Sequence, residues 1–336
     1  MTSTVRQRRV ARAMRPGDPR EVVEVAVEDV AGLEPGEVLV RVEAAAVNRS
    51  EGLALRGGAY AEGLEFPCPL GYEGAGTVVE AAPGAGVDAG TRVCWVPVVG
   101  SCADYVTAPA AMVVPIPDGL ATEDGARLPS AGATAQLLTR VWPLQGKTAV
   151  VWGAAGPVGR MLVALLAEAG TEVIGVASGE RVEAVEALGA THAIDRTSQG
   201  VAEAVLAATG GRGVAAVFDP VGAPTYQASL AMLGRRGCLV NYGELSGELP
   251  TVDLMELMEK GLFVTKFGGG GAYIDALSDL HGLVTGALAL AHRRPEVISE
   301  VGGRFPLDQA SEAYRALQSS PPGKILVVPD AGNAAR

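Results

Sequence analysis

The sequence predicts an α/β protein with two domains, one a barrel-like β domain and the other a doubly wound parallel sheet. Up to about residue 125, short strands are separated by turns that contain Gly and Pro, which is typical of an all-β domain. After that point strands alternate with amphipathic helices, which is typical of a parallel sheet covered by helices. A length of 336 residues suits two domains of ordinary size.

In the first domain, the apolar pattern predicts strands at Val38–Val42 and Thr77–Glu80. Turns are predicted at Glu34–Gly36 and Ala82–Gly84, where Pro and Gly occur together. An arginine-rich run extends from Arg6 to Arg15, and we interpret it as a solvated edge strand.

In the second domain, apolar runs predict the strands of a parallel sheet, with helices between them. The strands are expected at Thr148–Trp152, Val173–Ile174, Ala193–Ile194, Val214–Phe218 and Leu239–Asn241, and two of the helices at Val182–Leu188 and Ala202–Ala208. A glycine run after Phe267 breaks this pattern. Helices at Tyr273–His292 and Leu307–Leu317 and a strand at Lys324–Val328 are expected to close the chain.

The segment from Thr148 to Val176 has the order strand, Gly-rich turn, helix, strand, and in this context such a turn binds a dinucleotide. Gly156 lets the backbone approach a pyrophosphate, and Gly159 lets the helix pack close to the strand. The helix N-terminus then offers N–H groups and a positive dipole to the phosphates. The alternative is a purely structural turn. The contacts predicted from this turn are Ala155, Gly156, Pro157 and Val158.

The end of the second strand indicates which dinucleotide is bound. NAD sites usually hold an acidic residue there, about 20 residues past the turn, to bind the ribose 2′-hydroxyl. Here Ser178 holds that place, and Arg181 follows it. A hydroxyl and a guanidinium suit a 2′-phosphate, so NADPH is favoured over NADH. The alternative for Arg181 is an ordinary exposed helix residue.

Composition excludes several classes of function. The net charge of −11 argues against nucleic acid or an anionic membrane as a main partner. No apolar run is long enough for a membrane helix, and Met1–Arg15 lacks the apolar core of a signal peptide. The four cysteines form no disulfide framework, so a reducing cytoplasm is expected.

Seven motifs occur in a fixed order: Val42–Asn48, Gly71–Gly76, Leu128–Pro129 with Thr134–Ala135, Gly153–Gly159, Phe218–Gly222, Tyr242–Gly243 and Gly323–Lys324. With these motifs the chain resembles the medium-chain dehydrogenase/reductase superfamily, and most of all its zinc-free quinone oxidoreductase and enoyl reductase branch. The resemblance extends from about Val10 to Pro329.

This resemblance implies a GroES-like catalytic domain into which a Rossmann domain is inserted. The expected segments are residues 1–125 for the first part of the GroES-like domain, 126–268 for the Rossmann NADPH-binding domain, and 269–336 for a return segment that completes the catalytic domain. It also implies a homodimer that pairs through the Rossmann sheets.

The alcohol dehydrogenase branch of this superfamily binds catalytic zinc through Cys, His and Cys. The matching places here hold Asn48, Tyr72 and Ser130, and none of these is a usual zinc ligand. We therefore predict no metal. A simple ketone needs its oxygen polarised for hydride transfer, whereas a conjugated enone or quinone needs less help. The substrate is therefore expected to be a quinone or an activated C=C.

The resemblance also implies the residues of the site. Asn48, Tyr60 and Tyr72 are the catalytic candidates, with Tyr60 a possible proton donor and a rim aromatic as its alternative. Arg196 falls where relatives often have a Tyr near the adenosine, and Glu244 stands where related polyketide enoyl reductases often have Lys. The further cofactor contacts implied are Asn48, Thr134, Arg196, Val221, Tyr242, Gly243, Phe267 and Lys324, the last with a surface lysine as its alternative.

Together these observations predict an NADPH-dependent, zinc-independent reductase of a quinone or α,β-unsaturated carbonyl. Two alternatives stay open: an enoyl-thioester reductase of a biosynthetic pathway, and a cofactor-binding protein with little turnover.

Overall fold

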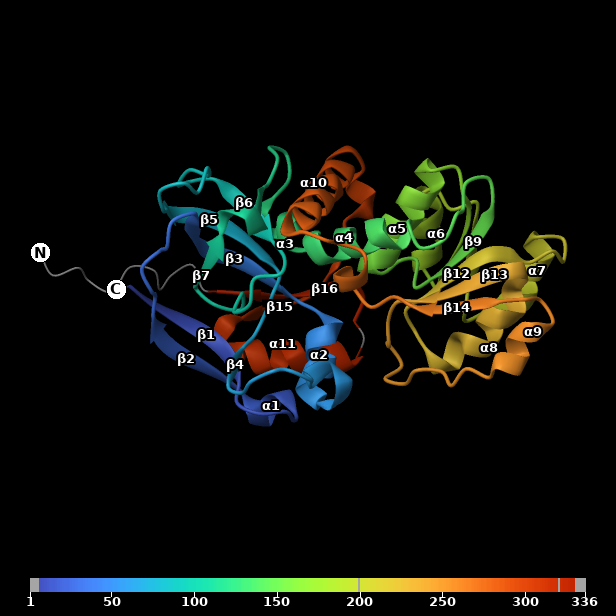
Figure 1. Ribbon diagram of the computed structural model, residues 1–336, viewed down its shortest axis with the longest axis horizontal. Coiled ribbons are helices and arrows are strands. Elements are labelled where there is room, and N and C mark those ends of the chain that lie inside the picture. Colours follow the sequence, from blue (N-terminus) through green and yellow to red (C-terminus); the bar gives the residue numbers. More distant parts are fainter. Residues whose placement is uncertain (1–5, 199, 320, 330–336) are drawn as a thin grey trace, which may run out of the picture. The chain divides into compact units, whose positions relative to one another are not determined.

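A computed structural model describes residues 6–198, 200–319 and 321–329, and the chain divides into two compact units (Figure 1). Of the described residues, the first unit comprises 6–130, 276–293, 300–319 and 321–329, and the second comprises 131–198, 200–275 and 294–299. Residues 1–5 and 330–336 of the expected first and last segments lie outside the described residues.

The unit boundaries differ from the expected breaks after residues 125 and 268. Residues 126–130 belong to the first unit, where Ser130 N donates to Glu73 Oε1 over 2.7 Å. Residues 269–275 belong to the second unit, since Tyr273 stacks on Phe267 with ring centroids 5.0 Å apart. Residues 294–299 also join the second unit, because Arg160 Nε donates to Glu296 O over 3.0 Å.

The first unit contains two sheets. One has the order β2-β1-β4, and the other runs β15-β16-β3-β5-β6-β8 with β7 paired to β3. The strands are β1 (Gln7–Ala13), β2 (Val23–Asp29), β3 (Glu37–Val47), β4 (Cys68–Pro69), β5 (Gly74–Ala81), β6 (Arg92–Trp95), β7 (Tyr105–Pro109), β8 (Val113–Pro115), β15 (Val301–Pro306) and β16 (Lys324–Val328). The core between them is made mostly of small apolar side chains around Trp95 and Tyr314.

The interpretation of the arginine-rich run as an edge strand is wrong. The run forms β1, which pairs with β2 on one side and with β4 on the other. Its arginines are held by acids: Arg8 pairs with Glu28 at 2.6 Å and Arg9 with Asp104 at 2.9 Å. Alternation of polar and apolar residues shows that one face is exposed, but it does not show how many neighbours a strand has.

The last two helices of the first unit, α10 and α11, begin later in the sequence than expected. They are α1 (Pro19–Val22), α2 (Arg49–Arg56), α3 (Thr122–Ala126), α10 (Leu277–Arg293) and α11 (Ala310–Ala316), with the 3-10 turns η1 (Gly58–Ala61), η2 (Ala110–Met112), η5 (Leu307–Gln309) and η6 (Leu317–Ser319). The helix expected from Tyr273 begins only at Leu277, because Asp279 accepts from Ala276 N and so caps it there. In the part of the chain that is described, no helix is long and apolar enough to cross a membrane.

The second unit is a six-stranded parallel sheet of order β11-β10-β9-β12-β13-β14. Its elements are α4 (Pro129–Leu138, which begins in the first unit), β9 (Thr148–Trp152), α5 (Pro157–Glu168), β10 (Glu172–Ala177), α6 (Arg181–Ala187), β11 (His192–Asp195), α7 (Val201–Ala208), β12 (Val214–Asp219), α8 (Ala223–Met232), β13 (Leu233–Asn241), α9 (Leu254–Met258), β14 (Phe263–Lys266), η3 (Gly270–Ala272) and η4 (Pro295–Val297). In chain order this is 3-2-1-4-5-6, the Rossmann arrangement. Helices α5 and α6 cover one face and α7 and α8 the other (Figure 1).

Candidate functional site

The Gly-rich turn lies where the strand order of the Rossmann sheet reverses, beside β9 and β12. This is the place at which such sheets bind ligands. Gly153 has a φ of +62°, and α5 starts at Pro157 directly after the turn. A Cβ on Gly159 would lie 2.2 Å from Gly153 O, so the helix can approach the strand only because residue 159 is glycine. The predicted contacts Ala155, Gly156, Pro157 and Val158 all lie at this helix N-terminus.

Ser178 and Arg181 are brought together at the end of β10. Arg181 Nη2 donates to Ser178 Oγ over 2.8 Å, which leaves the hydroxyl hydrogen available to another acceptor. Arg196 is exposed directly after β11, and its N–H donates to Ala177 O over 3.0 Å. Asp195 is a competing negative charge, and its pKa is lowered by hydrogen bonds from Thr197.

A buried carboxylate that the sequence reasoning did not single out shapes the turn after β12. Asp219 is 1% exposed, and it accepts from Val221 N at 2.7 Å and from Thr225 Oγ1 at 2.6 Å. Its pKa is raised by burial. Asp219 therefore fixes the backbone of Val221, one of the predicted cofactor contacts.

Tyr242 and Gly243 follow β13 at the same edge of the sheet. The Tyr242 hydroxyl lies 3.5 Å from Trp152 O, at the end of β9, and burial raises its pKa. Sequence reasoning missed Lys266, the last residue of β14, whose Nζ donates to Asn241 Oδ1 at 2.7 Å and to Gly243 O at 3.1 Å. Burial lowers the pKa of Lys266. The sequence alone holds no signal for Lys266, because its position depends on the parallel register that pairs it with Asn241.

Two other predicted cofactor contacts of the second unit, Phe267 and Thr134, differ in burial. Phe267 is buried, and its ring stacks on Tyr273. Thr134 is half-buried on α4.

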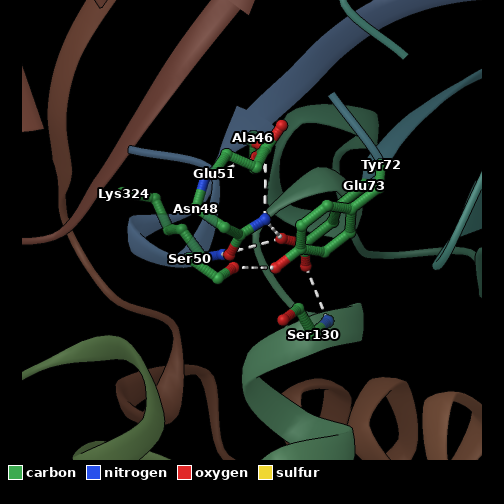
Figure 2. Close-up of polar contacts among 8 residues, drawn as sticks. All are labelled: Ala46, Asn48, Ser50, Glu51, Tyr72, Glu73, Ser130 and Lys324. Carbon is green, nitrogen blue, oxygen red and sulfur yellow. Dashed lines mark hydrogen bonds and ion pairs between the residues drawn. The ribbon is translucent and has the colours of Figure 1, made fainter. Parts of the chain in front are cut away.

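In the first unit, Asn48, Glu73 and Lys324 form a buried polar cluster (Figure 2). Lys324 Nζ donates to Asn48 Oδ1 at 2.5 Å and to Glu73 Oε2 at 2.6 Å, and Asn48 Nδ2 donates to the same Glu73 oxygen at 2.9 Å. Glu73 is fully buried and Lys324 is 6% exposed. Lys324 is therefore not the surface lysine of the alternative interpretation, and both polar atoms of the Asn48 amide are already engaged.

Sheet pairing places this cluster. Asn48 follows β3, and Lys324 begins β16, which is antiparallel to β3 with Ile325 opposite Val47. The next pair along the register is therefore Lys324 beside Asn48. Glu73 directly precedes β5, another neighbour of β3.

A second buried acid, Glu51, is hydrogen-bonded to the backbone of Asn48 and so supports this cluster. It was not predicted from the sequence. Glu51 Oε2 accepts from Asn48 N, while Oε1 accepts from Gly71 N and from the Tyr314 hydroxyl, each at 2.8 Å. Burial raises the pKa of Glu51 to about 7, against the opposing effect of these donors. The visible signal was an acid in the first turn of a helix that follows a strand, which is typical of an N-terminal cap.

The two tyrosine candidates have different surroundings. The Tyr72 hydroxyl lies 2.9 Å from Ser50 Oγ (Figure 2), and Ser130 is a second hydrogen-bond partner. Burial raises the pKa of Tyr72, so its phenol stays protonated. Tyr60 lies on η1 and is 38% exposed, outside the buried cluster.

The three places that match zinc ligands do not suit zinc. They hold an amide, a phenol and a hydroxyl, whereas zinc prefers thiolate, imidazole and carboxylate. The best of these oxygens, Asn48 Oδ1, already accepts from the Lys324 ammonium. Within the described ranges, no group of three or more His, Cys, Asp or Glu residues could hold a metal ion.

Family models, curated relatives and solved structures all match this chain to oxidoreductases. Residues 34–118 match the alcohol dehydrogenase GroES-like domain family, and residues 157–284 match the zinc-binding dehydrogenase family. A quinone oxidoreductase of Pseudomonas aeruginosa is 33% identical over 84% of this chain and 89% of its own length. A 2-haloacrylate reductase of a Burkholderia species is 32% identical over 80% of this chain and 83% of its own. The crystal structure of Escherichia coli quinone oxidoreductase complexed with NADPH superposes with a TM-score of 0.82 at 26% identity, covering 96% of this chain and 100% of that one.

Proposed function

Because the chain belongs to the medium-chain dehydrogenase/reductase superfamily, in its quinone oxidoreductase branch, we propose that it is an NADPH-dependent reductase of a quinone or an α,β-unsaturated carbonyl. The observation that carries this proposal is the Gly-rich turn on a Rossmann sheet with Ser178 and Arg181 in place of an acid. The relatives support it, since one is named a quinone oxidoreductase and another a 2-haloacrylate reductase.

NADPH, when bound, supplies a hydride to an electron-poor carbon of the substrate. The residues of the second unit would bind it: the α5 N-terminus takes the pyrophosphate, and Ser178 with Arg181 and Arg196 takes the 2′-phosphate. Tyr242, Gly243, Val221, Thr134 and Phe267 remain proposed contacts.

Residues of the first unit would then bind the substrate oxygen by a hydrogen bond. Ser50 and Tyr72 share one hydrogen bond, so one of the two hydroxyl groups keeps a hydrogen that it can donate to a carbonyl oxygen. Lys324 and Glu73 hold the Asn48 amide in one orientation, so we assign these residues a positioning role. No step requires zinc, because a conjugated acceptor delocalises the added charge onto oxygen.

Tyr60 is the proposed proton donor, since its side chain is accessible to solvent, from which the proton can be replaced. We expect Tyr60→Phe to lower kcat by roughly 10-fold or more if Tyr60 acts as the general acid. Tyr72→Phe is the matched control, and it should affect KM more than kcat. An unchanged kcat in Tyr60→Phe would mean that solvent donates the proton.

The reaction is tested by following NADPH oxidation with 1,4-benzoquinone, a small enone and a crotonyl thioester side by side. Turnover of the quinone or enone supports the proposal, and a preference for the thioester favours an enoyl-thioester reductase. Lys266 gives that second candidate some support, because its ammonium lies beside Gly243 although residue 244 is Glu. Tight NADPH binding without turnover would indicate a cofactor-binding protein. Elemental analysis of the purified protein should find no stoichiometric zinc.

The proposal includes a homodimer in the cytoplasm. Strand β14 lies at the edge of its sheet, and α9, which precedes it in the chain, exposes Leu254, Met255 and Met258. In a homodimer the edge strands of two sheets would pair, and these apolar side chains would be covered. Four free thiols suit a reducing compartment. Sedimentation of the protein at micromolar concentration tests the dimer.

A further inference from the structure

A hollow of about 500 Å³ lies in the second unit, at the amino-terminal edge of its sheet. It is lined by Trp142, Pro143, Lys147, Ala215, Arg235 and Arg236. Lys147 directly precedes β9, and Ala215 is the second residue of β12. The Gly-rich turn follows the other end of β9, which is five residues or roughly 16 Å away. The hollow is therefore separate from the proposed NADPH edge.

Three cations meet at this hollow without an acidic partner. Among the residues that the structure describes, the side chains of Lys147, Arg235 and Arg236 form no ion pair or hydrogen bond, and all three are exposed. This is unusual in a chain with a net charge of −11, in which arginines such as Arg8 and Arg294 are paired with glutamates. The cluster is thus a local region of positive charge that is free to meet an external anion.

A bulge in β13 presents the two arginines. Val214 pairs with Leu233, but Ala216 pairs with Cys238, so the intervening residues 234–237 protrude from the ladder. Arg236 has a φ of +59°, a region that usually favours Gly or Asn. Its N–H donates to Lys260 O at 2.8 Å, which anchors the bulge. The arginines therefore project from a fixed backbone.

An aromatic side chain forms one wall of the hollow. Trp142 is half-buried, and its ring packs on Phe263 with centroids 5.0 Å apart and planes inclined at 51°. Pro143 extends this apolar wall. Such a wall suits a flat ring, because rings stack on tryptophan.

We propose that this hollow binds a small ligand in which a phosphate group is joined to a flat ring, independently of the dinucleotide turn. The arginine guanidiniums match the geometry of a phosphate, and Lys147 adds a third positive charge. Trp142 takes the ring. A nucleic acid is the less favoured occupant, because the chain as a whole is acidic.

The test is a calorimetric titration of the full chain with AMP in the presence of saturating NADP⁺, so that the proposed cofactor edge is already filled. We expect saturable binding of AMP, weaker binding of inorganic phosphate and none of adenosine. Arg235→Gln/Arg236→Asn should weaken AMP binding at least 10-fold, and Asn is chosen because it tolerates the backbone of residue 236. Arg15→Gln/Arg56→Gln removes the same charge from exposed arginines of the first unit and should leave binding unchanged.

Tryptophan fluorescence provides a local readout. AMP should change the emission of the wild type, and Trp142→Phe should abolish that change while leaving Trp95 and Trp152 in place. The proposal is overturned if saturating NADP⁺ eliminates AMP binding, if both double variants bind AMP equally, or if an oligonucleotide binds and AMP does not.

Discussion

At the scale of single residues, the pair Lys324 and Glu73 is the most consequential contact of the first unit. Both side chains are buried, so removal of one leaves the other without compensation. We expect Lys324→Met to lower the free energy of unfolding by about 3–5 kcal/mol. Chemical denaturation measures this change, and Lys147→Met, at an exposed lysine, is the control that should have little effect.

The double variant Glu73→Gln/Lys324→Met separates charge from packing. It removes both charges together, so it should recover most of the stability that Lys324→Met loses. If it also recovers kcat, the pair acts only through the fold. If stability returns and kcat does not, the Lys324 ammonium is required to orient Asn48, since it donates to the Asn48 oxygen.

Cofactor choice is also decided by individual side chains. Loss of one charge-assisted hydrogen bond costs roughly 1.5–3 kcal/mol, so Arg181→Ala or Arg196→Ala should weaken NADPH binding by about 10- to 100-fold. NADH should be nearly unaffected, because it has no 2′-phosphate. The measurement is kcat/KM for both cofactors in each variant. A wild type that prefers NADH would refute the role of Ser178, and NADPH preference that survives both substitutions would leave the phosphate to Ser178 and the backbone.

At the scale of one element, the two glycines at the start of α5 have separate roles. A Cβ on Gly159 would lie 2.8 Å from Ala154 Cα as well as 2.2 Å from Gly153 O, whereas a Cβ on Gly156 would meet only Gly153 O, at 3.2 Å. Gly159→Ala should therefore cost about 1–3 kcal/mol of stability through overpacking. Gly156→Ala should cost less stability but weaken NADPH binding. Thermal unfolding and cofactor titration of both variants measure the two effects, and equal loss of stability would contradict this division.

Elements with strong local patterns were predictable. The strands of the Rossmann sheet and the helix after its Gly-rich turn follow from apolar runs and glycines that are adjacent in sequence. The neighbours of β1 were not predictable, because its alternation is the same for a central strand as for an edge strand. The start of α10 depends on a single carboxylate, Asp279, and the unit boundaries depend on contacts such as Phe267 with Tyr273.

At the scale of the whole molecule, the sequence identified Asn48 and Lys324 separately but not their contact. That contact joins residues 276 positions apart, and the contact of Glu51 with Tyr314 joins residues 263 apart. Motif spacing carries no information on such pairs, because they are set by which strands pair and which helices pack on them. The buried acids Glu73 and Asp219 were missed for the same reason, because their donors come from other elements or from the folded turn, whereas Glu51 had a local signal in its place in the first turn of α2.

Glu51 links this buried network to the stability of the whole chain. Burial raises its pKa to about 7 from an ordinary value of 4.5, so the folded protein holds a proton that the unfolded chain releases between these values. A raised pKa of an acid means that its contribution to stability is present in full below pH 4.5 and is lost as the pH rises through 7. The size of this contribution is roughly 3 kcal/mol, at 1.36 kcal/mol per pH unit.

Relative to Glu51→Gln, we therefore expect the free energy of unfolding of the wild type to fall by roughly 3 kcal/mol between pH 4.5 and pH 8. Gln cannot ionise, whereas groups common to both proteins, such as Asp219, cancel in the difference. Urea denaturation at intervals across this range measures it. Glu62→Gln, at an exposed carboxylate, is the control and should give a difference that stays flat. If the difference for Glu51→Gln is also flat, the hydrogen bonds from Asn48, Gly71 and Tyr314 cancel the effect of burial and the pKa of Glu51 is not raised. If it shifts in favour of the wild type as the pH rises, these hydrogen bonds outweigh burial and Glu51 is ionised across this range.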